Sequence, residues 1–255
     1  MIDVAEVFGI RSMLKLFCLA VLVFCAYPAS ADPVTPTQLY RAEAVVTGVF
    51  EPERTRGVRE ALRSVIVKLT GEHELYGDAR VDELAVHANS LVVSFEYEDR
   101  MKDIPVHDEQ GTRDRPHFLR VRFKSVALDK WLAENHLQKW HPPRPRVRVE
   151  LSVITARGAY TVRRTGSDGY AQREVIKENS VRRGIPVQLP TKTSNGEDKK
   201  APKLAGTLTL TDRGLWDIDW AFSHNNRVAR FALRSVTFDY AIRFGFNQIS
   251  SILRH

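Results

Sequence analysis

An apolar run near the N-terminus constrains the fold and chemistry of this chain more than any other feature of its sequence. Residues Leu16–Tyr27 carry no charge, Lys15 stands directly before them, and Pro28 ends the run. The next residues, Ala29-Ser30-Ala31, have the small-x-small spacing that a signal peptidase cleaves. The pattern predicts an exported protein that is cleaved after Ala31 and begins at Asp32 in its mature form.

Two other interpretations of this segment stay open. The apolar run is twelve residues long, and a helix needs roughly 20 residues to cross a bilayer. Export is therefore favoured over anchoring, with an uncleaved inner-membrane anchor at residues 14–28 as the alternative. A lipoprotein would carry its lipid on Cys25, but the bulky Phe24 before it disfavours that processing.

The first twelve residues fit an export signal poorly. Asp3 and Glu6 place negative charge where such a signal is positive. A start at Met13 gives Met-Leu-Lys followed directly by the apolar run. This indicates Met13 as the biological start of the protein.

Both cysteines, Cys18 and Cys25, lie inside the apolar run, so cleavage leaves no thiol in the mature chain. This excludes disulfides, thiolate metal sites and cysteine nucleophiles. The full chain is 43% hydrophobic and 27% charged, which excludes a disordered protein. Its net charge of +7 survives cleavage because the removed segment holds two acidic and two basic residues. Such a protein is attracted to anionic envelope surfaces and is not expected to bind nucleic acid.

Residues 32–141 predict a unit with the element order βααββα. A strand over 39–47 places Tyr40, Ala42, Ala44 and Val46 on one face, and a second strand, 118–123, alternates in the same way. Between them lie a helix that Gly71 ends, a weaker helix and a strand over 91–97. The buried stripe of the first helix is Val58, Ala61, Leu62, Val65, Ile66 and Leu69, and Lys68 falls on its solvated face. Ser125 is expected to cap a short closing helix.

Residues 142–255 predict a second unit of the same kind after a proline-rich linker at 141–145. It begins with a strand whose inward residues are Val147, Val149, Leu151 and Val153. A helix over 170–183, a mobile loop at 191–203 and a hairpin that joins 204–210 to 216–222 follow. A further strand over 228–233 and a C-terminal helix opened by Ser235 complete it. The predicted buried side of that helix is Phe238, Ala241, Ile242, Ile249, Ile252 and Leu253. The expected fold is α+β or α/β, as two small helix-on-sheet units, with Trp140 as a wedge between them.

Several stretches resemble the exported proteobacterial family known as domain of unknown function 2066. The most specific is Arg59–Gly71 (REALRSVIVKLTG), and Phe118–Phe123 (FLRVRF) and Arg182–Pro190 (RRGIPVQLP) are also similar to that family. The resemblance implies an exported protein with this architecture. It implies no activity and no catalytic residue.

The motifs of common enzymes do not occur in the sequence. Thr165–Gly169 (TGSDG) lacks the Gly-x-Ser-x-Gly spacing of a nucleophile elbow and indicates a turn. His73 and His107 have no second histidine one helical turn away, as zinc peptidases require. No phosphate-binding or dinucleotide-binding loop is present. We therefore expect no catalytic residue, metal or cofactor.

Basic residues on two predicted strands form the one candidate site. Arg120, Arg122 and Lys124 share one side of a strand, and Arg146 and Arg148 share one side of another. If these strands were neighbours, they would form a positive sheet face suited to phosphate or carboxylate groups. The alternative is cross-strand pairing with Glu43, Glu96, Glu98 and Glu150. The pair Arg182-Arg183 is expected to be solvated.

These features favour a non-catalytic binding or assembly protein of the periplasm that acts on an envelope protein or an anionic envelope polymer. An envelope hydrolase that uses scattered carboxylates is the second hypothesis, and it requires two facing acidic side chains in a deep pocket. An inner-membrane-anchored periplasmic protein is the third.

The export signal makes a direct prediction about the mature N-terminus. N-terminal sequencing of the protein isolated from the cell envelope should begin at Asp32, because cleavage is expected after Ala31. A sequence that begins at residue 1 or at Met13 would show an uncleaved segment and support the anchor.

Overall fold

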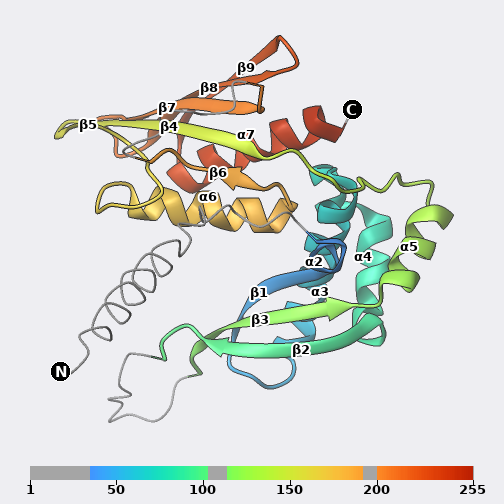
Figure 1. Ribbon diagram of the computed structural model, residues 1–255. Coiled ribbons are helices and arrows are strands. Elements are labelled where there is room, and N and C mark those ends of the chain that lie inside the picture. The colour runs from blue at the N-terminus through green and yellow to red at the C-terminus, as the bar shows by residue number, and fades with distance from the viewer. Residues whose placement is uncertain (1–34, 103–113, 192–199, 255) are drawn as a thin grey trace, which may run out of the picture. The chain divides into compact units, whose positions relative to one another are not determined.

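The computed structural model describes residues 35–102, 114–191 and 200–254, which form an α+β protein with two β-sheets and helices packed on them (Figure 1). The predicted fold class is therefore confirmed. The apolar run, the expected cleavage site with Ala29, Ala31 and Asp32, and most of the loop expected at 191–203 lie outside the described residues. Among the helices that are described, none has both the length and the apolar character needed to cross a membrane.

The first half of the described chain forms a three-stranded antiparallel sheet in the order β1-β3-β2. Its elements are α2 (Pro36–Leu39), β1 (Arg41–Thr47), α3 (Glu53–Thr70), α4 (Ala79–Val86), β2 (Val92–Asp99), β3 (Pro116–Phe123) and α5 (Ser125–Glu134), with 3₁₀ turns at His73–Gly77 and Ala88–Leu91. Apart from the short α2, this is the predicted βααββα order. The apolar stripe of α3 packs on one face of the sheet.

Alternation of side chains explains why this sheet has one buried face. Ala42, Ala44 and Val46 of β1 are buried, and the residues between them are exposed, as predicted. Gly71 ends α3 in the left-handed conformation, at φ 78°, which side chains other than glycine rarely adopt. The prediction that Ser125 caps α5 is wrong: Lys124 is the N-cap and Ser125 is the first helical residue.

The second half forms a larger sheet in the order β5-β4-β7-β8-β9, with β6 beside the start of β4. Its elements are β4 (Val147–Thr155), β5 (Gly158–Thr161), α6 (Tyr170–Arg183), β6 (Val187–Gln188), β7 (Lys203–Leu210), β8 (Trp216–His224), β9 (Arg227–Val236) and α7 (Phe238–Arg254). β4 and β7 are parallel, whereas β7, β8 and β9 form an antiparallel meander. The inward side chains of β4 are buried, and the hairpin of β7 with β8 forms as predicted.

Helix α7 covers the inner face of this sheet through Ala241, Ile242 and Ile249, which are fully buried. Two details of its prediction are wrong. Ser235 belongs to β9 and does not open the helix, which begins at Phe238. Ile252 is exposed, whereas its neighbour Leu253 packs against the core, so Ile252 lies on the outer side of the last turn.

Trp220 of β8 fixes the spacing between the sheet and α7. Its indole lies between two glycines, Gly206 of β7 and Gly245 of α7, and a Cβ added at either would come within 3 Å of the ring. The indole Nε1 donates a hydrogen bond of 3.1 Å to the carbonyl of Ala241. The side chain is thus buried with its polar atom satisfied.

This packing predicts that Gly206→Ala destabilises the protein. The new Cβ would lie 2.4 Å from two atoms of the Trp220 ring, so the free energy of unfolding should fall by about 1–3 kcal/mol. Denaturant unfolding of the variant measures this change. Gly77→Ala is the control, because a Cβ there meets no atom within 4 Å, and equal losses in the two variants would contradict the explanation.

Candidate functional site

The outer face of the first sheet carries Arg120 among three carboxylates. Its guanidinium lies 2.9 Å from Glu43 of β1, contacts Glu98 of β2, and lies 3.9 Å from Glu96. Arg120 is the cross-strand partner of both Glu43 and Glu96 in the sheet register. The structure therefore contains the ion pairs that were weighed as the alternative to an anion site on this strand.

The other two basic residues of this group contact neutral oxygens. The Nε of Arg122 donates to the hydroxyl of Ser94 at 3.2 Å. The Nζ of Lys124 donates to the carbonyl of Ser90 at 2.8 Å. These contacts fix both side chains across the end of β2.

The structure does not bring the two basic groups together. Arg120 and Arg122 lie on β3 of the three-stranded sheet, whereas Arg148 lies on β4 of the larger sheet and Arg146 directly precedes that strand. Alternation along each strand showed which side chains share a face, but not which strands are neighbours. The continuous positive face that adjacent strands would have formed is absent from the described residues.

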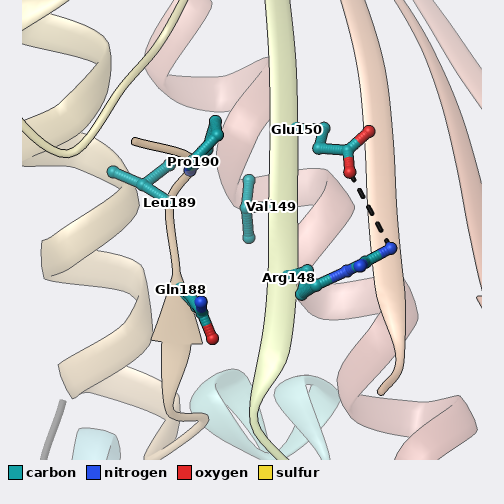
Figure 2. Close-up of a pocket in the computed structure, with 6 residues that line it drawn as sticks. All are labelled: Arg148, Val149, Glu150, Gln188, Leu189 and Pro190. Atoms are coloured by element: carbon teal, nitrogen blue, oxygen red, sulfur yellow. Dashed lines mark ion pairs between the residues drawn. The ribbon is translucent and has the colours of Figure 1, made fainter. Parts of the chain in front are cut away.

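Arg148 lines a small hollow at the edge of β4, which Figure 2 shows from the side. Its guanidinium lies 3.9 Å from Glu150, whose other carboxylate oxygen is 3.3 Å from the Nζ of Lys203. The rest of the lining comes from Val149, Gln188, Leu189 and Pro190.

The hollow arises because β4 has different neighbours along one edge. β6 pairs with it only at 147–148, and β5 pairs with it from residue 152 onward. The hollow has a volume of about 10 Å³, roughly the space of one water molecule, whereas pockets for small molecules usually have about 300–1,000 Å³. The hollow also contains one carboxylate, not the facing pair that glycoside hydrolysis requires.

A cluster of three buried cations was not expected from the sequence. Lys68 and Arg183 were both predicted to be solvated, and both predictions are wrong: their exposed fractions are 3% and 4%. Arg144, in the predicted linker, is 7% exposed. The three side chains lie where the C-terminal ends of α3 and α6 meet the segment before β4.

The guanidinium of Arg144 joins these elements through backbone carbonyls. Its Nη1 donates to the carbonyl of Arg183 at 2.8 Å, and its Nη2 donates to those of Lys68 at 2.7 Å and Trp140 at 2.9 Å. Lys68 and Arg183 belong to the last turns of α3 and α6, where the helix dipoles place partial negative charge. Burial lowers the pKa of Arg144 to about 10, so the group stays charged at neutral pH.

Trp140 completes this junction. Its indole lies under the Arg144 guanidinium, with 4.2 Å between the guanidinium carbon and the ring centre. Its backbone N–H donates to the carbonyl of Leu69 at 2.7 Å. The Ser250 hydroxyl of α7 donates to the carbonyl of Gly71 at 2.9 Å, so α7 is tied to the end of α3 beside this junction.

Lys68 and Arg183 are held by neutral oxygens as well. The Nζ of Lys68 donates to the carbonyl of Arg41 at 2.5 Å. Arg183 donates to the side-chain oxygen of Asn179 at 2.6 Å and to that of Asn247 at 2.9 Å. Because carbonyl and amide oxygens occupy these donors, we interpret the cluster as a structural junction and not as a ligand site.

The free edge of β2 is the most unusual surface of the first sheet. β2 pairs with β3 on one side, and no described strand pairs with its other side. Val93 and Phe95 are 48% and 45% exposed, and Phe50, before α3, is 72% exposed. The sequence predicted that Val93, Phe95 and Tyr97 share one inward face, but burial does not alternate along β2, because a register shift interrupts the strand at Val93 and α3 leaves the strand largely uncovered.

Local contacts hold the aromatic side chains at this edge in place. The guanidinium of Arg54 lies 5.4 Å from the centre of the Phe95 ring, and Tyr97 packs edge-on against Phe95 at 5.7 Å. The Tyr97 hydroxyl donates to the carbonyl of Val49 at 3.0 Å. The apolar surface is therefore presented by a supported strand.

Histidine and acidic side chains do not gather into a candidate metal centre. In residues 35–102, 114–191 and 200–254, no three or more of these side chains are arranged so that they could hold a metal ion. Of the two histidines considered in the sequence, His73 lies close to Glu74, and His107 lies outside the described residues.

The buried lysine predicts a specific pH dependence of stability. Burial, together with the positive charges of Arg144 and Arg182, lowers the pKa of Lys68 from 10.5 to about 8. Between these values the unfolded chain binds the proton and the folded chain does not, so the free energy of unfolding should rise with pH, by about 3 kcal/mol at most.

Denaturant unfolding below pH 8 and near pH 10.5 tests this effect. Lys68→Met should remove this part of the rise, whereas Lys130→Met, on the exposed surface of α5, should keep it. Equal pH dependence in the wild type and Lys68→Met would show that Lys68 is not the group responsible.

Comparison with known proteins corrects the family resemblance suggested by the sequence. Residues 34–141 match the model of a family described as Domain of unknown function (DUF8605). This is a different family from domain of unknown function 2066, so the resemblance drawn from stretches such as Arg59–Gly71 is wrong. No curated protein matches the chain. The match covers the part of the chain from α2 to α5 and gives no activity.

Proposed function

We propose that this protein is a non-catalytic binding or assembly factor of the periplasm, and that it binds an extended polypeptide segment of an envelope partner along β2. The observation that carries this proposal is the uncovered edge of β2 with its exposed Val93 and Phe95. The export signal in the sequence supports the compartment.

The backbone of β2 offers the first part of such a site. Val92–Asp99 is eight residues long and forms one outer edge of its sheet (Figure 1). A register shift at Val93 leaves Ser94–Asp99 as its regularly paired part. A strand at a sheet edge has N–H and C=O groups that point away from its neighbour and can pair with an added strand. Proteins usually shorten or cover such edges, so a long edge with apolar side chains indicates a binding surface.

The side chains beside the edge offer the second part. Phe50, Val93 and Phe95 are exposed at or next to β2, and each aromatic or aliphatic side chain gains about 1.5–3 kcal/mol when it becomes fully buried. An added strand would cover Val93 and Phe95 as it pairs with the backbone. Affinity would then come from the main chain and selectivity from the side chains.

The charges of the structure favour a polypeptide over an anionic polymer as the partner. Arg120 is surrounded by Glu43, Glu96 and Glu98, and Arg148 is close to Glu150. Neither group of basic residues forms a broad positive face. The hydrolase hypothesis receives no support from the hollow at Arg148, which is small and has one carboxylate.

Photo-crosslinking in the cell envelope tests this proposal. A benzophenone amino acid placed at Val93 of the full chain should yield an adduct with another polypeptide, because an added strand would lie against this side chain. The substitution Phe95→Lys should lower the yield of that adduct about tenfold, through lost apolar contact.

Val181 of α6 provides the matched control, since it is also an exposed valine. The benzophenone at Val181 should not give the same adduct, and Val181→Lys should not change the yield from position 93. An adduct that persists unchanged in the Phe95→Lys variant would refute binding at β2.

A further inference from the structure

We infer that the strand added to β2 comes from a second copy of this chain, and that it is the edge strand β9. This inference rests on the proposed function, since it names the partner of the same edge. Three observations carry it: the two strands are both sheet edges, their charges are opposite, and their side chains alternate in compatible ways over the regularly paired residues 94–99 and 227–233, outside the register shifts of each strand.

β9 is the outer strand of the larger sheet and is ten residues long (Figure 1). It contains Arg227, Arg230 and Arg234 and no acidic residue. Arg234 binds Asp219 of the neighbouring β8 at 2.6 Å. Arg227 and Arg230 are exposed and form no ion pair with the described parts of the chain. The edge therefore offers two guanidinium groups to a partner.

β2 has the opposite charge in a protein whose net charge is +7. Its eight residues include Glu96, Glu98 and Asp99 and no lysine or arginine. Arg120 contacts Glu98 but lies 3.9 Å from Glu96, whose side chain is 71% exposed. The carboxylate of Glu96 is thus the one most open to a basic partner.

The charge pattern selects among the possible pairings of edges. Two β2 strands from different copies would bring carboxylates together, and two β9 strands would bring guanidinium groups together, so both symmetric pairings are disfavoured. A β2 strand beside the β9 strand of another copy pairs opposite charges. Cross-strand pairs of this kind stabilise a sheet, whereas like charges directly opposite each other destabilise it.

The apolar side chains fit the same arrangement. Phe95 and Tyr97 are opposite Val121 and Leu119 in the register of the first sheet, so they lie on its helix-covered face. Phe231 of β9 is opposite Trp220 and packs against Phe244 of α7, on the corresponding face of the larger sheet. A joined sheet would place both apolar rows on one face and Glu96 and Arg230 on the other.

Pairing of two different edges leaves one free edge at each end of a dimer. Such head-to-tail association continues to further copies unless the rotation between copies closes a ring. The expected state is therefore a distribution of oligomers that shifts with protein concentration, rather than a fixed symmetric dimer.

Sedimentation velocity over a range of concentrations tests this inference on protein purified from cells that express the full chain. The wild type should associate increasingly with concentration. Glu96→Lys and the double variant Arg227→Glu/Arg230→Glu should each raise the apparent dissociation constant by about tenfold or more. Each variant places like charges on the two edges.

A mixture of the two variants gives the decisive result. In one contact, the lysine on β2 of the first variant lies beside the glutamates on β9 of the second variant. In the other contact, the unchanged β2 of the second variant lies beside the unchanged β9 of the first. Both contacts pair opposite charges, so the mixture should associate again. Arg157→Glu, in the turn between β4 and β5, reverses a charge away from both edges and should leave association unchanged. Circular dichroism confirms that each variant is folded.

The outcomes separate this inference from the proposed function. A wild type that is monomeric at all concentrations, or variants that associate like the wild type, would overturn the inference. If the benzophenone at Val93 still gave an adduct with a different polypeptide, binding at β2 would stand with another partner. If neither association nor an adduct occurred, both proposals would fail.

Discussion

The guanidinium of Arg144 is the interaction on which the arrangement of this protein most depends. It is buried, and it donates to carbonyls at the ends of α3 and α6 and to that of Trp140. An isolated charge in such a place would cost several kcal/mol, and the hydrogen bonds of both terminal nitrogens offset that cost, although the buried Nε has no hydrogen-bond partner in the described part of the chain. Here the acceptors are helix ends that already carry partial negative charge. Removal of the guanidinium would leave carbonyls of two helices without a partner in the interior.

The two hydrophobic cores are built around this junction. One consists of α3 against the three-stranded sheet, and the other consists of α6 and α7 against the larger sheet. Trp140 belongs to the second core but donates its backbone N–H to Leu69 in the first half. The segment before β4 is therefore an ordered part of the fold, even though its prolines exclude regular secondary structure.

The sequence predicted the secondary structure well where one physical rule dominates. Alternation identified the inward residues of β1 and β4, and the spacing of apolar residues identified the buried stripe of α3. The rule failed for Lys68 and Arg183, whose burial depends on elements that approach from distant parts of the chain. It also did not show that α3 leaves β2 uncovered, or that β3 and β4 belong to different sheets. These are properties of tertiary packing, and a single sequence without aligned relatives contains no direct signal for them.

The choice of acceptors at Arg144 decides how the junction responds to acid. Ion pairs with aspartate or glutamate are lost when acid protonates the carboxylate. Backbone carbonyls and the side-chain amides of Asn179 and Asn247 do not titrate in that range. The hydrogen bonds of Arg144 and Arg183 at this junction therefore involve no carboxylate. Protonation of a carboxylate would leave these hydrogen bonds intact.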